Sequence, residues 1–91
     1  MFVKKWGSGP GTDNNQLAYP YGVTVDQTSN VFVVDTSNQR ISKFTATGTF
    51  IRKWGAPGTS SGQFKNPRLL VTDAAGNVYV ADVENNRIQK F

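Results

Sequence analysis

The chain has 91 residues, the size of one ordinary domain, of which 37% are hydrophobic and 18% charged. It contains no cysteine and no histidine, which excludes disulfides, thiolate or imidazole metal ligands and Ser-His-Asp catalysis. Ten Lys and Arg residues against six Asp and Glu give a net charge of +4, which is compatible with a nucleic-acid partner without requiring one.

Short apolar runs separated by Gly, Pro, Asn and Ser follow one another along the chain, and no helical periodicity is sustained. The runs are rich in Val, Ile, Phe, Tyr and Thr, as half-buried strands are. The spacing predicts an all-β meander with tight turns. In chain order the predicted strands are Phe2–Trp6, Gly22–Asp26, Asn30–Asp35, Arg40–Thr45, Thr49–Trp54, Leu69–Asp73, Asn77–Asp82 and Arg87–Phe91.

The early residues contain no apolar stretch typical of a signal peptide, and no run approaches the ~20 apolar residues of a membrane helix. We therefore expect a soluble protein with no membrane partner.

The sequence repeats itself. FVKKWG at 2–7 returns as FIRKWG at 50–55, and residues 20–44 return as residues 67–91 with eleven identical positions. We therefore predict that residues 1–91 form a single domain of two repeats, 2–48 and 50–91, with four strands in each. A period of about 47 residues with four strands is that of a propeller blade.

Several segments of both repeats carry a family resemblance. Lys-Trp-Gly, a Gly/Ser loop, Pro-x-Gly-Val, Asn-Val-Tyr-Val-Ala-Asp and Asn-Asn-Arg-Ile-Gln-Lys-Phe together resemble the NHL repeat of β-propellers. The resemblance covers almost the whole chain. It implies four-stranded antiparallel blades with strands A to D from the central channel outward. The strand order is then D-A-B-C-D-A-B-C.

Two glycine positions of the pattern differ between the repeats. Gly22, which follows the proline, becomes Leu69, and Gly76 of the A–B turn becomes Ser29. A left-handed backbone at Ser29 would cost roughly 1 kcal/mol. Neither change alters the predicted fold.

The strand order leaves one strand and one edge unmatched. Phe2–Trp6 corresponds to the outer strand of a blade before the first, while Arg87–Phe91 has no outer neighbour. Two blades cannot close a ring, and an open strand edge pairs readily with another chain. We therefore expect a structural module whose partner is itself, assembled head to tail by strand exchange. The expected interface residues are Phe2, Val3, Lys4, Lys5, Trp6, Arg87, Ile88, Gln89, Lys90 and Phe91.

Whole chains contribute two blades each, so a closed ring has an even number of blades. Six or eight blades, from three or four chains, are the sizes we consider. The resemblance implies six, because single-chain NHL propellers are commonly six-bladed. A homotrimer is therefore favoured over a tetramer, and other closures or a filament stay open.

Two acid–base pairs recur in the repeats: Asp35 with Arg40, and Asp82 with Arg87. They suit either an acid/base or anion site, or structural pairs that bracket the loop between strands B and C. Their recurrence favours the structural role. Asp26 and its counterpart in the second repeat are interpreted as turn formers rather than metal ligands, and we expect no metal and no cofactor.

Aromatic side chains alternate along the D strands, which suits either a base-stacking platform or packing between blades. The shared register of the two repeats favours packing. The residues concerned are Phe2, Trp6, Phe50 and Trp54, with Phe32, Phe44, Tyr79 and Phe91 expected in the core between sheets.

The alternative function is a binding propeller for protein, glycan or single-stranded RNA. The resemblance implies that such binding uses the face formed by the D–A and B–C loops, where Tyr19, Tyr21, Lys65 and Arg68 are the candidate residues. Asp13 and Glu84 lie in loops of the same face, which is therefore nearly neutral, and the remaining basic residues lie mainly on outer strands. An enzyme similar to the NHL-type amidating lyases needs metal-bound histidines, so we expect no enzyme.

Overall fold

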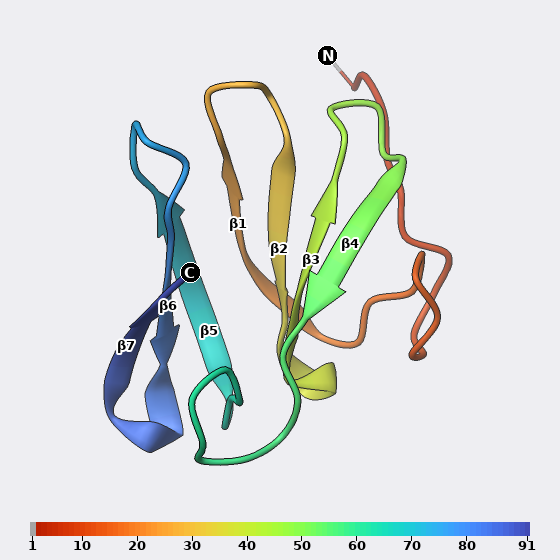
Figure 1. Ribbon diagram of the computed structural model, residues 1–91. Helices are drawn as coiled ribbons and strands as arrows, with labels where there is room; N and C mark the ends of the chain where they lie inside the picture. The colour runs from red at the N-terminus through yellow and green to blue at the C-terminus, as the bar shows by residue number, and fades with distance from the viewer. Residues whose placement is uncertain (1) are drawn as a thin grey trace.

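The computed structural model describes residues 2–91, which form two antiparallel sheets lying side by side (Figure 1). Each sheet is a meander of neighbouring strands. The first has the order β1-β2-β3-β4 and the second β5-β6-β7. The strands are β1 (Pro20–Val25), β2 (Val31–Asp35), β3 (Arg40–Phe44), β4 (Phe50–Trp54), β5 (Pro67–Thr72), β6 (Val78–Asp82) and β7 (Arg87–Lys90).

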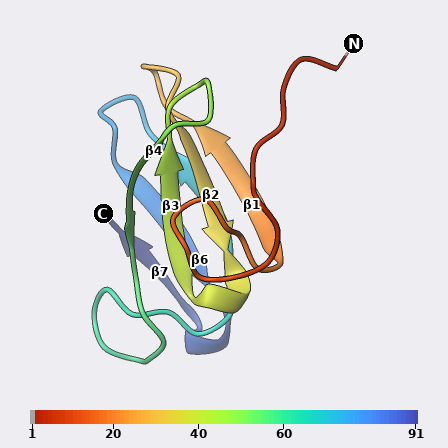
Figure 2. The ribbon, with the colours of Figure 1, turned by 90° about the vertical axis from the view of Figure 1, so that its right-hand side faces the viewer.

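The all-β prediction and seven of its strands are confirmed, with ends that shift by one or two residues. The strand predicted at Phe2–Trp6 is wrong for the single chain, where these residues form no strand. They lie beside the four-stranded sheet on the side away from β5–β7 (Figures 1 and 2). A strand needs a backbone partner, and none of the strand pairs described within residues 2–91 includes residues 2–6.

The turns between the first two strands of each sheet are built on an aspartate. Asp26 Oδ1 accepts hydrogen bonds from the backbone N–H groups of Thr28 and Asn30, which closes the turn locally. The left-handed backbone falls on Ser29, at φ 66°, and on Gly76, at φ 88°. Ser29 therefore adopts the left-handed conformation whose cost is given above.

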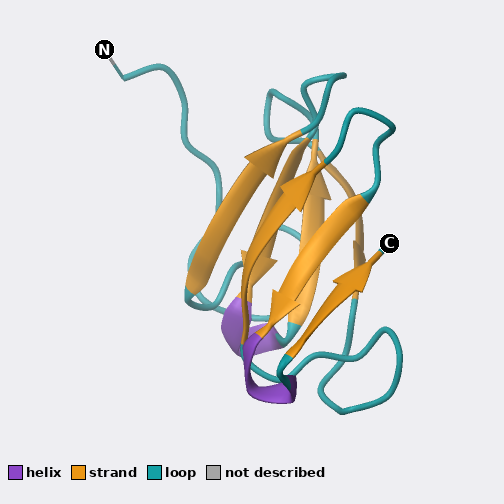
Figure 3. Ribbon diagram, turned by 90° about the vertical axis from the view of Figure 1, so that its left-hand side faces the viewer, coloured by secondary structure: helices purple, strands orange, loops and turns teal. Residues whose placement is uncertain are grey.

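Strands two and three of each sheet are joined by a 3-10 turn, η1 (Thr36–Asn38) and η2 (Val83–Asn85). Each ends on a left-handed residue, Gln39 or Asn86. Both turns lie at the same end of the molecule (Figure 3). Among the helical segments of residues 2–91, none has the length and apolar character needed to cross a membrane.

The core lies between the two sheets, where β1 and β5 run side by side. Gly22 on β1 permits this approach, because a Cβ there would stand 2.6 Å from the carbonyl oxygen of Arg68. Trp54 packs against the edge of this core. The buried side chains are Phe32, Val34 and Ile41 from the first sheet and Phe64, Leu70, Val78 and Val80 from the second half of the chain.

Candidate functional site: two loop anchors and an open sheet face

A buried ion pair holds the loop that leads into β1. Arg40 Nε donates to Asp35 Oδ2 at 2.7 Å, and both side chains are almost fully buried. The other guanidinium nitrogens donate to the carbonyl oxygens of Thr12, Asp13 and Gln16. The arginine therefore connects the end of one hairpin to a loop that is more than twenty residues away in the sequence.

The same anchor recurs in the second sheet. Arg87 Nε donates to Asp82 Oδ2 at 2.9 Å. Its remaining nitrogens donate to the carbonyl oxygens of Thr59, Ser60 and Gln63, which are the equivalents of the first loop's acceptors. Its side chain is 28% exposed, whereas that of Arg40 is 7% exposed.

The carboxylates of these anchors are saturated with donors. Asp82 accepts from the backbone N–H of Lys65 and from Asn85 as well as from Arg87. Burial alone would raise the pKa of Asp82, but these hydrogen bonds and the Arg87 charge outweigh it and lower the pKa. A carboxylate held ionised and fully paired is a poor general acid or base, so the geometry suits loop anchoring rather than proton transfer.

The turn aspartates are also held ionised. Hydrogen bonds from the Asn77 side chain and backbone, with a further one from Tyr79, lower the pKa of Asp73 to about 2. Burial would raise the pKa of Asp26, but hydrogen bonds from Asn30 and Thr28 outweigh it and lower the pKa. Across residues 2–91 there is no cluster of three or more Asp and Glu side chains suited to a metal ion.

Three of the four candidate ligand residues lie together. The Tyr19 and Tyr21 rings are 6.4 Å apart, and the Arg68 guanidinium lies over the Tyr21 ring at 4.7 Å. Both tyrosines are more than half exposed. Lys65 belongs to the other loop and not to this cluster. Its backbone N–H donates a hydrogen bond to Asp82 Oδ1, and its carbonyl oxygen accepts one from the backbone N–H of Glu84.

The segment before the first loop is placed by one aromatic contact. The Trp6 and Phe44 ring centroids are 6.1 Å apart at 53°. In the second repeat, Trp54 and Phe91 pack at 5.6 Å and 56°. Trp6 is therefore placed against the first sheet much as Trp54 of β4 is placed against the second. The predicted interface residues of the two ends are not brought together within one chain.

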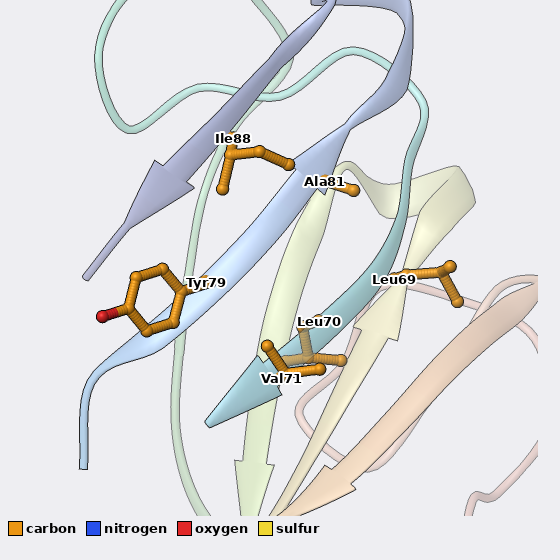
Figure 4. Close-up of a pocket in the computed structure, with 6 residues that line it drawn as sticks. All are labelled: Leu69, Leu70, Val71, Tyr79, Ala81 and Ile88. Atoms are coloured by element: carbon orange, nitrogen blue, oxygen red, sulfur yellow. The ribbon is translucent and has the colours of Figure 1, made fainter. Parts of the chain in front are cut away.

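The three-stranded sheet leaves one apolar face uncovered, which we call the open face. It consists of Leu69, Val71, Tyr79, Ala81 and Ile88, which surround a shallow pocket with Leu70 (Figure 4). Leu69, Val71 and Ile88 are each more than half exposed. The sequence prediction named only Ile88 of these as an interface residue, although β-strand alternation places Leu69, Val71 and Tyr79 on that side.

Phe64 is another residue that the sequence prediction missed. It is fully buried and packs on Phe91 at 5.7 Å. Its equivalent in the first loop is Leu17. An apolar residue at the same place in two otherwise polar loops was the available signal.

Comparisons with known proteins agree with this architecture. The family model described as NHL repeat matches residues 17–44 and 64–91. Protein lin-41 of Caenorhabditis elegans is 45% identical over 49 residues, which is 54% of this chain and 4% of that protein. The chain is thus a small part of the length of this relative.

Among solved structures, one described as a streptogramin B lyase structure resembles the chain with a TM-score of 0.61 at 18% identity. The match covers 90% of this chain and 28% of that one. The similarity shows the fold alone, an antiparallel arrangement similar to part of a β-propeller.

Proposed function

The chain belongs to the NHL repeat family, and from this premise we propose that it is a non-catalytic structural module that closes a propeller ring with further copies of itself. The copies associate head to tail, the second sheet of one chain against the first sheet of the next. Residues 2–6 of one copy add a fourth strand to the three-stranded sheet of the neighbouring copy, which is a strand exchange. We favour a homotrimer of six blades over a tetramer of eight.

One comparison within the chain carries the proposal. Ile41 on the first sheet is 0% exposed because the second sheet covers it, whereas its equivalent Ile88 is 67% exposed. Phe32 and Val34 are likewise buried, whereas their equivalents on the open face, Tyr79 and Ala81, are only half-buried. The open face therefore has the residue pattern of a face that a further blade covers, and burying it removes apolar surface from water.

The opposite side of the molecule offers the matching surface. Gly22 faces the second sheet, so strand alternation places Val23 and Val25 of β1 on the other side, where they are 66% and 55% exposed. The equivalent of Val23 is Leu70, which is buried against the first sheet. A second copy that docks its first sheet on the open face repeats the order in which the two sheets already follow one another inside the chain. Such unlike surfaces give a ring or a filament, and the resemblance of the repeats to six-bladed propellers favours a ring.

The junction between copies differs from the junction within the chain. Gly22 allows β5 to approach closely, but Leu69 holds the equivalent place on the open face and has a side chain. The Thr36 hydroxyl donates to the Pro67 carbonyl across the internal junction, and its equivalent Val83 has no donor. The junction between copies is therefore wider at the inner strands and the weaker of the two.

The absence of catalysis is supported by the state of the carboxylates. Asp35 and Asp82 are buried and engaged in anchoring loops, and Asp26 and Asp73 close turns. The sequence supplies no histidine or cysteine as an alternative nucleophile, base or metal ligand.

A pair of charge variants tests the proposed docking. Ile88→Glu places a carboxylate in the centre of the open face, where a docked sheet would bury it. Ile51→Glu makes the same change at an exposed position of β4 outside that face. Sedimentation velocity is expected to show monomers for the first variant and an assembled wild type and control. A wild type that sediments as a monomer would refute the proposal, as would an Ile88→Glu variant that assembles normally.

A further inference from the structure

We infer that residues 2–6 pair with β7 of a second copy in one defined register, with Phe2 opposite Phe91, Lys4 opposite Lys90 and Trp6 opposite Ile88. The inference rests on the proposed function and specifies its strand exchange residue by residue. The strand that pairs with the free edge of β7 is thus an extended segment from a second copy of the chain.

The register follows from the observed pairing of β4 with β3, because the two strands have the equivalent sequences in the first repeat. Phe50 pairs with Phe44, Arg52 with Lys43 and Trp54 with Ile41. The segments FVKKWG and FIRKWG share their aromatic and basic positions, and RIQKF of the second repeat matches RISKF of the first. The shift of 47 or 48 residues converts each observed pair into one of the pairs that we infer.

The segment is already placed for this role. Trp6 rests on Phe44, and the following loop is tied by Arg40 and by a hydrogen bond from the Ser8 backbone N–H to the Asn15 carbonyl. Residues 2–5 are exposed along their length and form no strand within their own chain, so they are accessible to a second copy. A segment held in position loses less conformational entropy on pairing than a free tail does.

The receiving edge has a partly exposed phenylalanine beside a pocket. Phe44 is 1% exposed and lies 5.9 Å from Phe50, its neighbour on β4. Phe91 is 37% exposed and borders a pocket of about 480 Å³ lined also by Arg52, Trp54, Gly55 and Gly62. Phe2 of the second copy is the equivalent of Phe50 and would cover Phe91 from this side.

Trp6 would then lie between two aromatic rings. Trp54 contacts Phe32 edge-on at 6.2 Å as well as Phe91. The equivalent of Phe32 is Tyr79 on the open face. Trp6 keeps its contact with Phe44 of its own chain and gains Tyr79 of the second copy, so it joins the two chains at the seam.

The register places two cationic side chains, Lys4 and Lys90, opposite one another, and β3 and β4 already contain such a pair of cations. Lys43 and Arg52 are opposite, yet each lies over a ring, Lys43 over Phe32 at 5.2 Å and Arg52 over Trp54 at 5.0 Å. Lys90 already lies over Tyr79 at 5.6 Å. With Lys4 over Trp6, both cations of the new pair have an aromatic partner, which offsets their repulsion.

The absence of cysteine from the sequence allows a direct test by disulfide formation. In the variant Lys4→Cys/Lys90→Cys the two thiols are opposite one another on one face of the paired strands, within bonding range. In the control Lys5→Cys/Lys90→Cys they point to opposite faces. After mild oxidation we expect chain-to-chain bonds in the first variant and at least about tenfold fewer in the control, on a non-reducing denaturing gel.

The mass of each variant's assembly under reducing conditions is measured in parallel with the gel. It distinguishes a wrong register from a failure to assemble. Assembled particles with no chain-to-chain bond in the first variant, or with more bonds in the control, overturn the register while the ring stands. The inferred register does not need the two lysine side chains, which repel one another. A Lys4→Cys/Lys90→Cys variant that stays monomeric where the wild type assembles would therefore also contradict the register. A monomeric wild type overturns the proposed function and this inference together.

Discussion

The two arginines show how a single side chain can fix a long loop. Each guanidinium uses its fork of donors on one carboxylate and three backbone carbonyls, which otherwise would need water or turn partners. Lysine offers a point charge rather than this planar fork. The recurrence of arginine at both positions is therefore explained by geometry and not by charge alone.

Removing the more buried anchor should cost more than removing the other. Arg40→Met leaves Asp35 as a buried charge without its cation, an arrangement that costs about 3–5 kcal/mol. Arg87→Met should cost less, because that side chain is partly exposed to water. Urea denaturation of the two variants measures the difference. Equal losses, or a larger loss for Arg87→Met, would contradict the assigned burial.

The turn aspartate in the second repeat should give the fold an acid-sensitive component. The folded protein lowers the pKa of Asp73 from its ordinary 3.8 to about 2, so the unfolded chain binds the proton more readily. The stability that Asp73 contributes is then fully present above about pH 4 and lost as the pH falls toward 2.

Comparison of the wild type with Asp73→Asn tests this contribution. Between pH 4 and 2, the urea midpoint of the wild type should fall more steeply than that of the variant, which has no carboxylate to protonate there. Parallel pH profiles of the two proteins over this range would show that the aspartate makes no such contribution.

At the scale of elements, the sequence was sufficient wherever a strand has its partners within the chain. The hairpins β1–β2 and β5–β6 have aspartate turns and alternating apolar residues, and both were predicted within two residues. Phe2–Trp6 has a strand-like sequence similar to that of β4 but pairs with no strand of its own chain. Local sequence records the propensity to be a strand, while the pairing depends on which edges are available.

The candidate sites divide in the same way. Spacing within a repeat indicated the Asp35–Arg40 pair, because both residues bracket one short turn. It could not indicate the carbonyl acceptors of Thr12 or Gln16, which come from a distant loop. The open face was recognised at Ile88 only, since the prediction assigned strands without tracing which side of the sheet each residue faces.

Deletion of residues 2–7 should separate folding from assembly at this scale. The deletion removes Trp6 from its contact with Phe44 and removes the strand offered to a second copy. We expect monomers or aggregates in sedimentation velocity, with loss of a packed aromatic residue costing about 3–5 kcal/mol at most. An intact ring formed by the shortened chain would show that the strand is not exchanged.

At the scale of the whole molecule, the two sheets have one shared face and two free ones. The shared face holds the core, while Val23 and Val25 on one side and the open face on the other remain exposed to solvent. Exposed apolar faces of this kind are the usual mark of an interaction surface. Repeats that bury their faces only against neighbours gain stability with each neighbour added.

Native mass spectrometry measures the number of chains in the assembly and so tests the proposed ring most directly. The proposal predicts a dominant species of three 10.0 kDa chains that gives way to monomers on dilution, because association stabilises the fold by mass action. A dominant species of four chains would replace the six-bladed ring with an eight-bladed one. A monomer that persists across all concentrations, with its open face uncovered, would contradict the account.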